Sequence, residues 1–318
     1  MVHLRLVVPP ELVDPVLGVL RETESVYGIV HLRGVAERPT GDLVTCEVAR
    51  EDASIVVGDL CRLGLDDVGS IVLESVDTAV SETARRAERV AAGSPADAVV
   101  WEEVEARTSE GTELSSSFLV FMVVATLIAG VGILTDSIIL IIGAMVVGPE
   151  FGPLAALCVA LVERRLDFAR RSAVALAVGF PAAILATYLG TLVFQWIGEA
   201  PDDARDHPET LFISSPSWFS VVVALLAGVA GMLSLTTAKS GAIVGVLISV
   251  TTIPAAANVG VAAAYSEWDE VGGAASQLII NLVSIVVAGV ATLLAQRWGY
   301  ARRRERHRRS LERVDQEA

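Results

Sequence analysis

The residues best suited to do chemistry lie in one interrupted apolar stretch. Residues 141–153 read IIGAMVVGPEFGP, with three glycines, two prolines and one carboxylate inside a long apolar run. At membrane depth, irregular backbone persists only where it is buried in protein or lines a cavity, and an ionisable residue there indicates a functional site. The residues expected to bind a solute or ion are Gly148, Pro149, Glu150, Gly152 and Pro153.

Glu150 is the residue on which this hypothesis depends. A charged side chain at the centre of a membrane helix costs roughly 2.5–3.5 kcal/mol, so Glu150 should face the protein interior, carry a proton or meet a cation. A protonated carboxyl would suit a proton-coupled carrier. Two structural roles are the alternatives: Glu150 could face a crevice open to the cytoplasm, or it could cap a half-helix that begins near Gly152.

A second interruption, 101 residues further on, resembles the first. Residues 124–157 and 223–260 each contain a glycine-bearing helix, a short polar turn and an apolar span broken at a proline, Pro153 or Pro254. Three spans per copy would make the second copy enter the membrane in the opposite direction, and interrupted spans in inverted halves mark the midplane site of secondary transporters. The second copy is expected to contribute Thr251, Thr252 and Pro254. The alternative role of the two threonines is to cap backbone groups that the proline leaves free.

Four further polar residues lie within or beside the apolar runs. Asn258 and Asn281 could contact a substrate; hydrogen bonds between helices, worth about 0.6–2 kcal/mol each, are the alternative. Asp136 and Lys239, the chain's only lysine, occupy equivalent polar turns of the two copies. We expect these two as candidate gating residues, with a role in setting membrane orientation as the alternative.

Composition separates an acidic soluble part from a membrane part. The 318 residues are 53% hydrophobic, whereas the net charge is −12 over residues 1–115 and −2 over residues 116–318. Nucleic-acid binding needs a basic surface, so an acidic soluble part argues against it. Three cysteines without CxxC spacing and four scattered histidines predict no metal site, no cofactor and no disulfide scaffold.

The first 77 residues predict a small α+β domain. Strand-like alternation occurs over 2–8, 26–36, 42–50 and 69–76, and amphipathic helices are predicted over 11–23 and 51–63. This βαββαβ order is typical of the ferredoxin-like fold. Residues 78–115 are predicted to form a helical connector in two pieces, broken at residues 93–95.

Six apolar runs predict an α-helical polytopic domain over residues 116–298. The candidate spans are 117–134, 138–162, 172–197, 217–236, 241–265 and 276–297. Arginines gather after the second span and in the tail, residues 299–318, whereas the loops after the third and fifth spans are acidic. The positive-inside rule therefore predicts a multi-pass protein of the cytoplasmic membrane with both termini in the cytoplasm.

The interrupted stretch resembles a known sequence pattern. The run IIGAMVVGPEFGPLAAL, after a first span ending in GILTDS, is similar to that of the prokaryotic hydrophobic-domain membrane proteins called domain-of-unknown-function family 389. The matching residues are Gly143, Ala144, Met145, Pro149 and Pro153. The resemblance implies a multi-span membrane protein and no particular biochemistry. Glu150 departs from the pattern, which has an apolar residue there, so a carboxylate-dependent function would be particular to this branch.

These patterns favour a transporter. We expect a secondary transporter or channel-like carrier of a small solute or ion, proton- or cation-coupled, with the ferredoxin-like domain as regulator or oligomerisation unit of a homo-oligomer. The alternative is a membrane-anchored sensor whose soluble domain binds a small ligand without transport. An intramembrane enzyme is not expected, because the spans contain no paired nucleophile and base.

Overall fold

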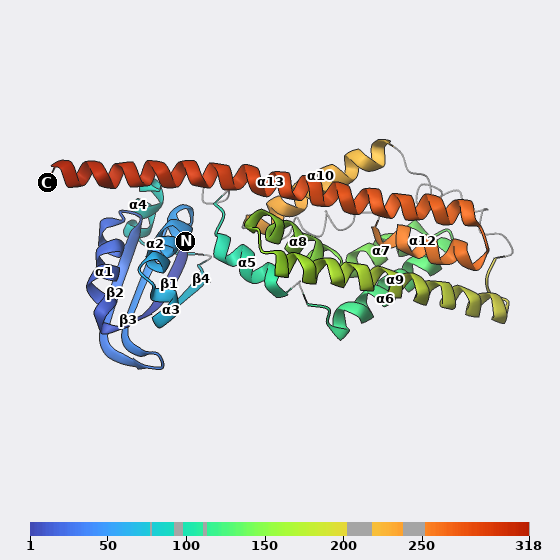
Figure 1. Cartoon of the computed structure of the whole chain (residues 1–318), viewed down its shortest axis with the longest axis horizontal. Helices are drawn as coiled ribbons and strands as arrows, with labels where there is room; N and C mark the ends of the chain where they lie inside the picture. The colour runs from blue at the N-terminus through green and yellow to red at the C-terminus, as the bar shows by residue number, and fades with distance from the viewer. Residues whose placement is uncertain (77, 92–97, 111–112, 202–217, 238–251, 318) are drawn as a thin grey trace. The chain divides into compact units, whose positions relative to one another are not determined.

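Alternating apolar residues at the start of the chain form a four-stranded sheet. The computed structural model describes residues 1–76, 78–91, 98–110, 113–201, 218–237 and 252–317 (Figure 1). The strands are β1 (Val2–Val8), β2 (Val26–Glu37), β3 (Thr40–Val48) and β4 (Ser70–Ser75), in the spatial order β2-β3-β1-β4. All three pairings are antiparallel, so the predicted four-stranded N-terminal sheet is confirmed.

Two helices cover one face of this sheet. After a short 3-10 turn, Pro10–Leu12, helix α1 (Val13–Glu22) joins β1 to β2, and α2 (Arg50–Arg62) with the short α3 (Leu65–Val68) joins β3 to β4. The period of two along a strand places every second residue of β1 toward these helices. The core residues shared by β1, α1 and α2 include Val2, Leu4, Leu6, Val16, Leu20, Val56 and Leu60. The observed element order is therefore the predicted βαββαβ.

Two connector helices follow the sheet. Helix α4 (Glu82–Val90) begins at Ser81, whose hydroxyl accepts a hydrogen bond from the Ala84 amide, and it buries Ala84 and Ala87. Helix α5 (Trp101–Glu110) comes next. The chain divides into two compact units within α5: the first is Met1–Val104 with Thr236–Ala238 and Gln296–Ala318, and the second is Glu105–Leu235 with Lys239–Ala295. The predicted break at residues 93–95 lies outside the described residues.

The second unit is helical. Its described helices are α6 (Ser116–Leu134), α7 (Ile138–Val147), α8 (Phe151–Glu163), α9 (Leu166–Ile197), α10 (Trp218–Thr236), α12 (Thr252–Ala264) and the start of α13 (Trp268–Glu317). At several glycines of these helices an added methyl group would collide with a neighbouring helix. A Cβ on Gly228 of α10 would lie 2.7 Å from the Ile285 carbonyl oxygen of α13. Close approach of this kind is typical of membrane helices.

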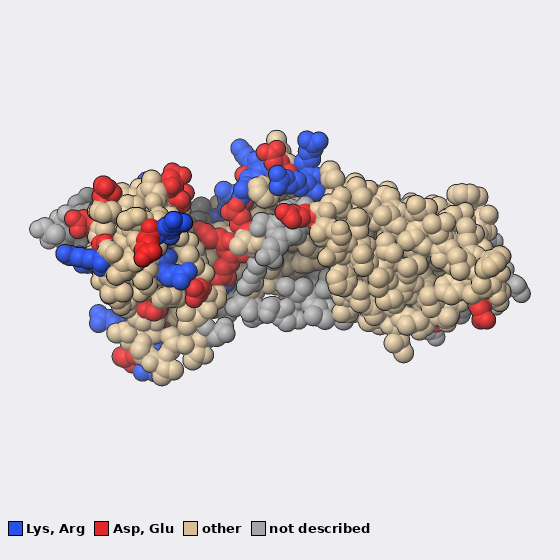
Figure 2. Space-filling view, turned by 90° about the horizontal axis from the view of Figure 1, so that it is seen from below, with Lys and Arg blue, Asp and Glu red and all other residues tan. Residues whose placement is uncertain are grey.

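Several helices of the second unit are long enough to cross a bilayer. Four described helices (α6, α9, α10 and the Trp268–Gly299 part of α13) are long and apolar enough to span a membrane. Helices α7 and α8 pass the same criterion as a pair bent by 49°. Figure 2 shows a broad surface of this unit almost free of Lys, Arg, Asp and Glu. The chain is therefore a membrane protein with several spans; of the predicted span 241–265, only residues from 252 onward are described.

Two pairs of helices in the helical unit end at a nearly constant spacing along the chain. Helices α6 and α10 end 102 residues apart, at Leu134 and Thr236, and helices α8 and α12 end 101 residues apart, at Glu163 and Ala264. The turns that end α8 and α12 also match: Arg164 and Ser266 have φ angles of 59° and 61°. The amides of Arg165 and Glu267 each donate a 2.9 Å bond to the carbonyl five residues earlier.

Candidate functional site

Proline and glycine break the second apolar run where the sequence predicted. Helix α7 ends at Val147, the Gly148 amide donates to the Ala144 carbonyl at 3.0 Å, and the backbone of Gly148 then becomes extended (φ −61°, ψ 129°). Pro149 has no N–H with which to continue the helix. Helix α8 restarts at Phe151 and carries Pro153 in its first turn, where a missing N–H costs nothing.

Glu150 lies between the two half-helices and is buried. It is 2% exposed, and its Oε1 accepts a 2.8 Å hydrogen bond from the hydroxyl of Thr252. Glu150 occupies the N-cap position of α8, yet its side chain makes no capping hydrogen bond. Of the roles considered from the sequence, capping by the side chain is therefore not the observed one.

Thr252 links the two proline-bearing segments. It is the first described residue of α12, it is fully buried, and Pro254 follows two residues later in that helix. A Cβ built on Gly148 would lie 2.4 Å from Oε2 of Glu150 and 2.7 Å from Cγ1 of Ile253. Glycine is thus the residue type that lets the carboxylate and the start of α12 approach the α7–α8 break.

The carboxylate has few polar neighbours among the described residues. Within that part of the chain, no basic side chain forms an ion pair with Glu150, and Oε2 has no hydrogen-bond partner. A buried charge without a partner is strongly disfavoured. Of the three expectations for Glu150, the structure shows that it faces the protein interior; a proton or a cation would neutralise it there.

The remaining predicted residues differ in their relation to this site. Asn258 lies on α12, 6% exposed. Asp136 lies in the α6–α7 turn and has a left-handed φ of 47°. The ten residues of α7, about 15 Å of helix, separate this turn from the α7–α8 break. The structure therefore does not bring Asp136 and Glu150 together. Thr251 and Lys239 lie outside the described residues.

Helix α13 carries a buried polar pair of which the sequence analysis predicted only one member. The predicted Asn281 is 2% exposed, and its Oδ1 accepts a 3.2 Å hydrogen bond from Nε2 of Gln277, which is 1% exposed. Gln277 was not singled out, although its position one turn before Asn281 places both on one face of the helix. That spacing is the signal that could have identified it.

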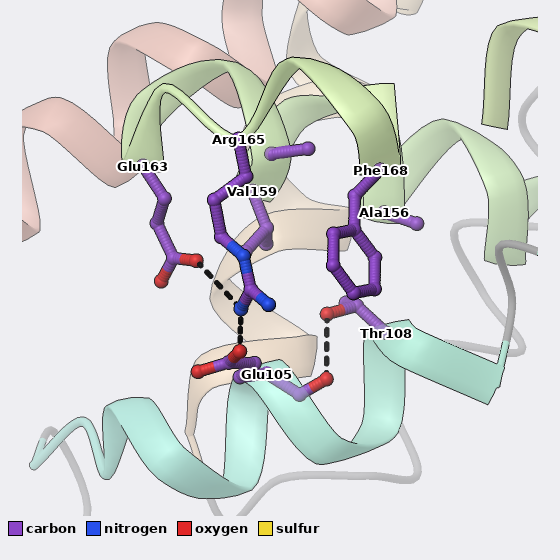
Figure 3. A pocket seen from close by; sticks show the side chains of 8 residues that line it. Glu105, Thr108, Ala156, Val159, Glu163, Arg165 and Phe168 are labelled. Atoms are coloured by element: carbon purple, nitrogen blue, oxygen red, sulfur yellow. Dashed lines mark hydrogen bonds and ion pairs between the residues drawn. The ribbon is translucent and has the colours of Figure 1, made fainter. Parts of the chain in front are cut away.

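A small hollow lies elsewhere in the helical unit, between α5, α8 and α9 (Figure 3). Arg165 lies over the ring of Phe168, with 4.1 Å to its centroid, and forms ion pairs with Glu105 and, at 3.9 Å, with Glu163. The hollow measures about 20 Å³, which is room for little more than a water molecule. These contacts tie α5 to the α8–α9 turn and leave no space for a solute.

Comparison with known proteins gives a family and one distant relative. The family described as "Domain of unknown function (DUF389)" matches residues 145–287. An uncharacterized protein of Methanocaldococcus jannaschii, MJ0678, is 24% identical over 198 residues, which span 62% of this chain and 59% of that protein. No solved structure matches the chain. Residues 145–287 are thus similar to the DUF389 family, which confirms the resemblance seen around the interrupted stretch.

Proposed function

We propose that the protein is a secondary transporter or channel-like carrier of a small solute or ion, proton- or cation-coupled. Its site lies between the α7–α8 break and the start of α12. The observation that carries this proposal is the hydrogen bond between Thr252 and the buried carboxylate of Glu150. A carboxylate between half-helices, with one oxygen unpartnered, suits reversible binding of a proton or cation.

An inverted repeat is the second part of the proposal. The matching spacing between the ends of α6 and α10 and between the ends of α8 and α12 supports two copies of one three-span unit. Three spans per copy reverse the direction of the second, so the two proline-bearing segments approach the midplane from opposite sides. Alternating access in such folds is a movement of one half against the other around a central site.

The arginines support one orientation of this unit. The turn after α8 and the start of α9 contain Arg164, Arg165, Arg170 and Arg171. By the positive-inside rule we place this end, and both termini, in the cytoplasm with six spans. The cytoplasmic membrane is then the proposed location.

The N-terminal domain is assigned a regulatory or oligomerisation role. Its sheet order and alternating helices support a ferredoxin-like fold, a fold that by itself does not select a function. A homo-oligomer organised by this domain is the arrangement that we propose.

Flux through reconstituted protein tests the proposal. Full-length chain in liposomes with a trapped pH-sensitive dye should move protons under an imposed gradient, and Glu150→Gln should reduce the rate at least tenfold. The matched control is Glu163→Gln, which removes the same charge from the other end of α8 and should retain flux.

Two outcomes would contradict it. Full flux in Glu150→Gln would remove the carboxylate from the mechanism. If the wild-type chain moved neither protons nor sodium, while its soluble domain bound a small ligand, the sensor would replace the transporter.

A further inference from the structure

We infer that a second copy of this chain docks, face to face, on the open side of the N-terminal sheet, about a two-fold axis parallel to the strands. The open face is the side of the sheet that α1 and α2 leave uncovered. The inference rests on the proposed function for the role of this domain, because it supplies the contact surface of the proposed homo-oligomer.

The strand pairings fix which residues lie on the open face. The buried core takes the even-numbered residues of β1 from Val2 to Val8, so the odd-numbered residues point away from the helices. Residues directly opposite each other in an antiparallel ladder share a face. The three open-face pairs between β1 and β3 are, in order along the strands, His3 with Glu47, Arg5 with Thr45, and Val7 with Leu43.

Apolar side chains extend one half of this face onto the outer strands. Val30 of β2 lies opposite Thr45 and is 49% exposed. Leu32 of the same strand lies opposite Leu43 and is 47% exposed. Val72 of β4 extends the face on the other side of β1. Large apolar side chains gathered on one exposed surface indicate an interaction site.

Helix α4 leaves this apolar half uncovered. It contacts β2 near Tyr27, because burial and the nearby charges of Glu47 and of Glu88 on α4 raise the pKa of Tyr27. Tyr27 pairs with Glu47 and therefore lies at the charged end of the face. The described part of the chain thus leaves Val30 and Leu32 open for a partner.

The pattern of the face selects one arrangement of two copies. A two-fold axis parallel to the strands and midway between β1 and β3 exchanges these strands and keeps each residue at its own height. His3 then faces Glu47 of the second copy, and Val7 faces Leu43 of the second copy. An axis across the strands would instead set the charged end of one copy on the apolar end of the other, which would bury charges without partners.

Charge complementarity identifies a second copy as the occupant. Arg5 is exposed on an inner strand of the sheet and forms no ion pair among the described residues. In the face-to-face pair it lies about 7 Å along the strand direction from Glu47 of the second copy, within reach of an arginine side chain. His3 and Glu47 form a 3.2 Å pair within one chain, and each meets the opposite member of the second copy's pair. Two faces of this composition therefore attract each other in one register.

Cysteine cross-linking of the full-length protein in detergent tests the inference. Thr45→Cys, beside the axis, is combined with Cys61→Ser, because Cys61 is an exposed native thiol on α2, on the other side of the sheet. We expect a short bismaleimide to convert most of the Thr45→Cys protein to a covalent dimer. The wild type, which keeps Cys61, is the matched control and should yield at least tenfold less dimer.

Further changes to the Thr45→Cys protein test the predicted contacts. Leu43→Asp should lower the dimer yield at least tenfold, because it places a charge in the apolar half of the face. Arg5→Glu should also lower the yield, and Arg5→Glu/Glu47→Arg should restore it by exchanging the two charges. If Leu43→Asp does not fold, Val30→Lys at its exposed position provides the same test. Hydrogen exchange of the β1 amides checks folding in each variant.

The outcomes separate this inference from the proposed function. A dimer yield from Thr45→Cys no higher than that of the wild type would overturn the inference, as would a yield that Leu43→Asp and Val30→Lys both leave unchanged. Val35 is 54% exposed on β2, so dimer from Val35→Cys without dimer from Thr45→Cys would indicate edge-to-edge pairing and also overturn it. Proton flux without a cross-linked dimer would remove this inference alone, and a cross-linked dimer without flux would remove the proposed transport alone.

Discussion

Two carboxylates, one in each unit of the molecule, differ in the partners that surround them: Glu103 is partly buried beside the buried Arg50, whereas Glu150 is itself buried. Glu103, in the first unit, accepts from Arg50 Nη2 at 2.8 Å and from the Ser75 hydroxyl at 2.5 Å. Glu150, in the helical unit, has one hydroxyl donor and no ion pair among the described residues. Arg50 itself is 8% exposed and also donates to the Ala98 carbonyl.

This difference in partners indicates a structural role for Glu103 and a functional role for Glu150. The ion pair of the buried Arg50 with Glu103 holds helix α5 in place, because removal of the carboxylate would leave the buried arginine charge without a partner. A buried acid without a counter-charge contributes nothing comparable to stability, and such perturbed groups gather at functional sites.

The largest expected effect is on the paired carboxylate. Glu103→Leu should destabilise the first unit by about 3–5 kcal/mol, because the charge of Arg50, which is 8% exposed, would remain buried without its partner. Hydrogen exchange of the β1 and β4 amides in the full-length protein measures the loss. The double variant Arg50→Met/Glu103→Leu should recover most of it; equal exchange in the single and double variants would contradict the ion-pair explanation.

A smaller effect is expected at the site itself. Thr252→Val removes the hydroxyl bonded to Oε1 and should cost about 1–3 kcal/mol, the penalty for a buried acceptor left unpaired. Thermal unfolding in detergent measures it, and Thr252→Ser should restore it. Thr191→Val is the control: its buried hydroxyl donates to the Thr187 carbonyl of its own helix at 2.9 Å, so a loss as large as that of Thr252→Val would count against a special contact at Glu150.

Two glycines near each other on the second apolar run should respond differently to one methyl group. Gly148→Ala places a Cβ 2.4 Å from Oε2 of Glu150 and should cost about 1–3 kcal/mol through overpacking. Gly143→Ala, one turn earlier within α7, meets nothing within 4 Å and should be neutral or stabilising by up to about 1 kcal/mol. Equal melting temperatures for the two variants would show that the carboxylate is not held where the structure places it.

The smallest effect concerns a third acid, Glu51, at the start of α2. It is 5% exposed, and burial raises the pKa of its carboxyl above the ordinary value. The folded state therefore binds a proton more tightly than the unfolded state, and this contribution is lost as the pH rises through the folded-state pKa. Glu51→Gln should stabilise the first unit on the order of 1 kcal/mol at pH 7 and have no advantage well below pH 4. An advantage that grew toward low pH would reverse the sign and contradict the burial of a charged form.

Much of the fold could be predicted because its signals are local. Pro149 and Gly148 dictate a helix break wherever they stand, and alternation over residues 2–8 dictates a strand with one buried face. Helix ends were less predictable: α9 begins at Leu166, six residues before the predicted span, because its first turns contain charged residues that an apolar-run criterion excludes.

The candidate site could be predicted only in part. Glu150 and Thr252 stood out because each is polar beside a proline in an apolar run. Gln277 did not stand out. The ion pair of Arg50 with Glu103, 53 residues apart, could not be predicted either, because an arginine or glutamate in the sequence looks the same whether it is exposed or buried. Burial, which distinguishes them, is a property of packing.

The sequence by itself determined that the second apolar run is interrupted, that an acid lies in the interruption, and that a similar proline-bearing segment follows 101 residues later. These follow from covalent constraints on proline and glycine and from the length of apolar runs. Only the tertiary structure decided that the Thr252 hydroxyl meets the Glu150 carboxylate and that no basic residue among those described pairs with it. Such contacts depend on how α6, α7, α9 and α12 pack, which no local preference specifies.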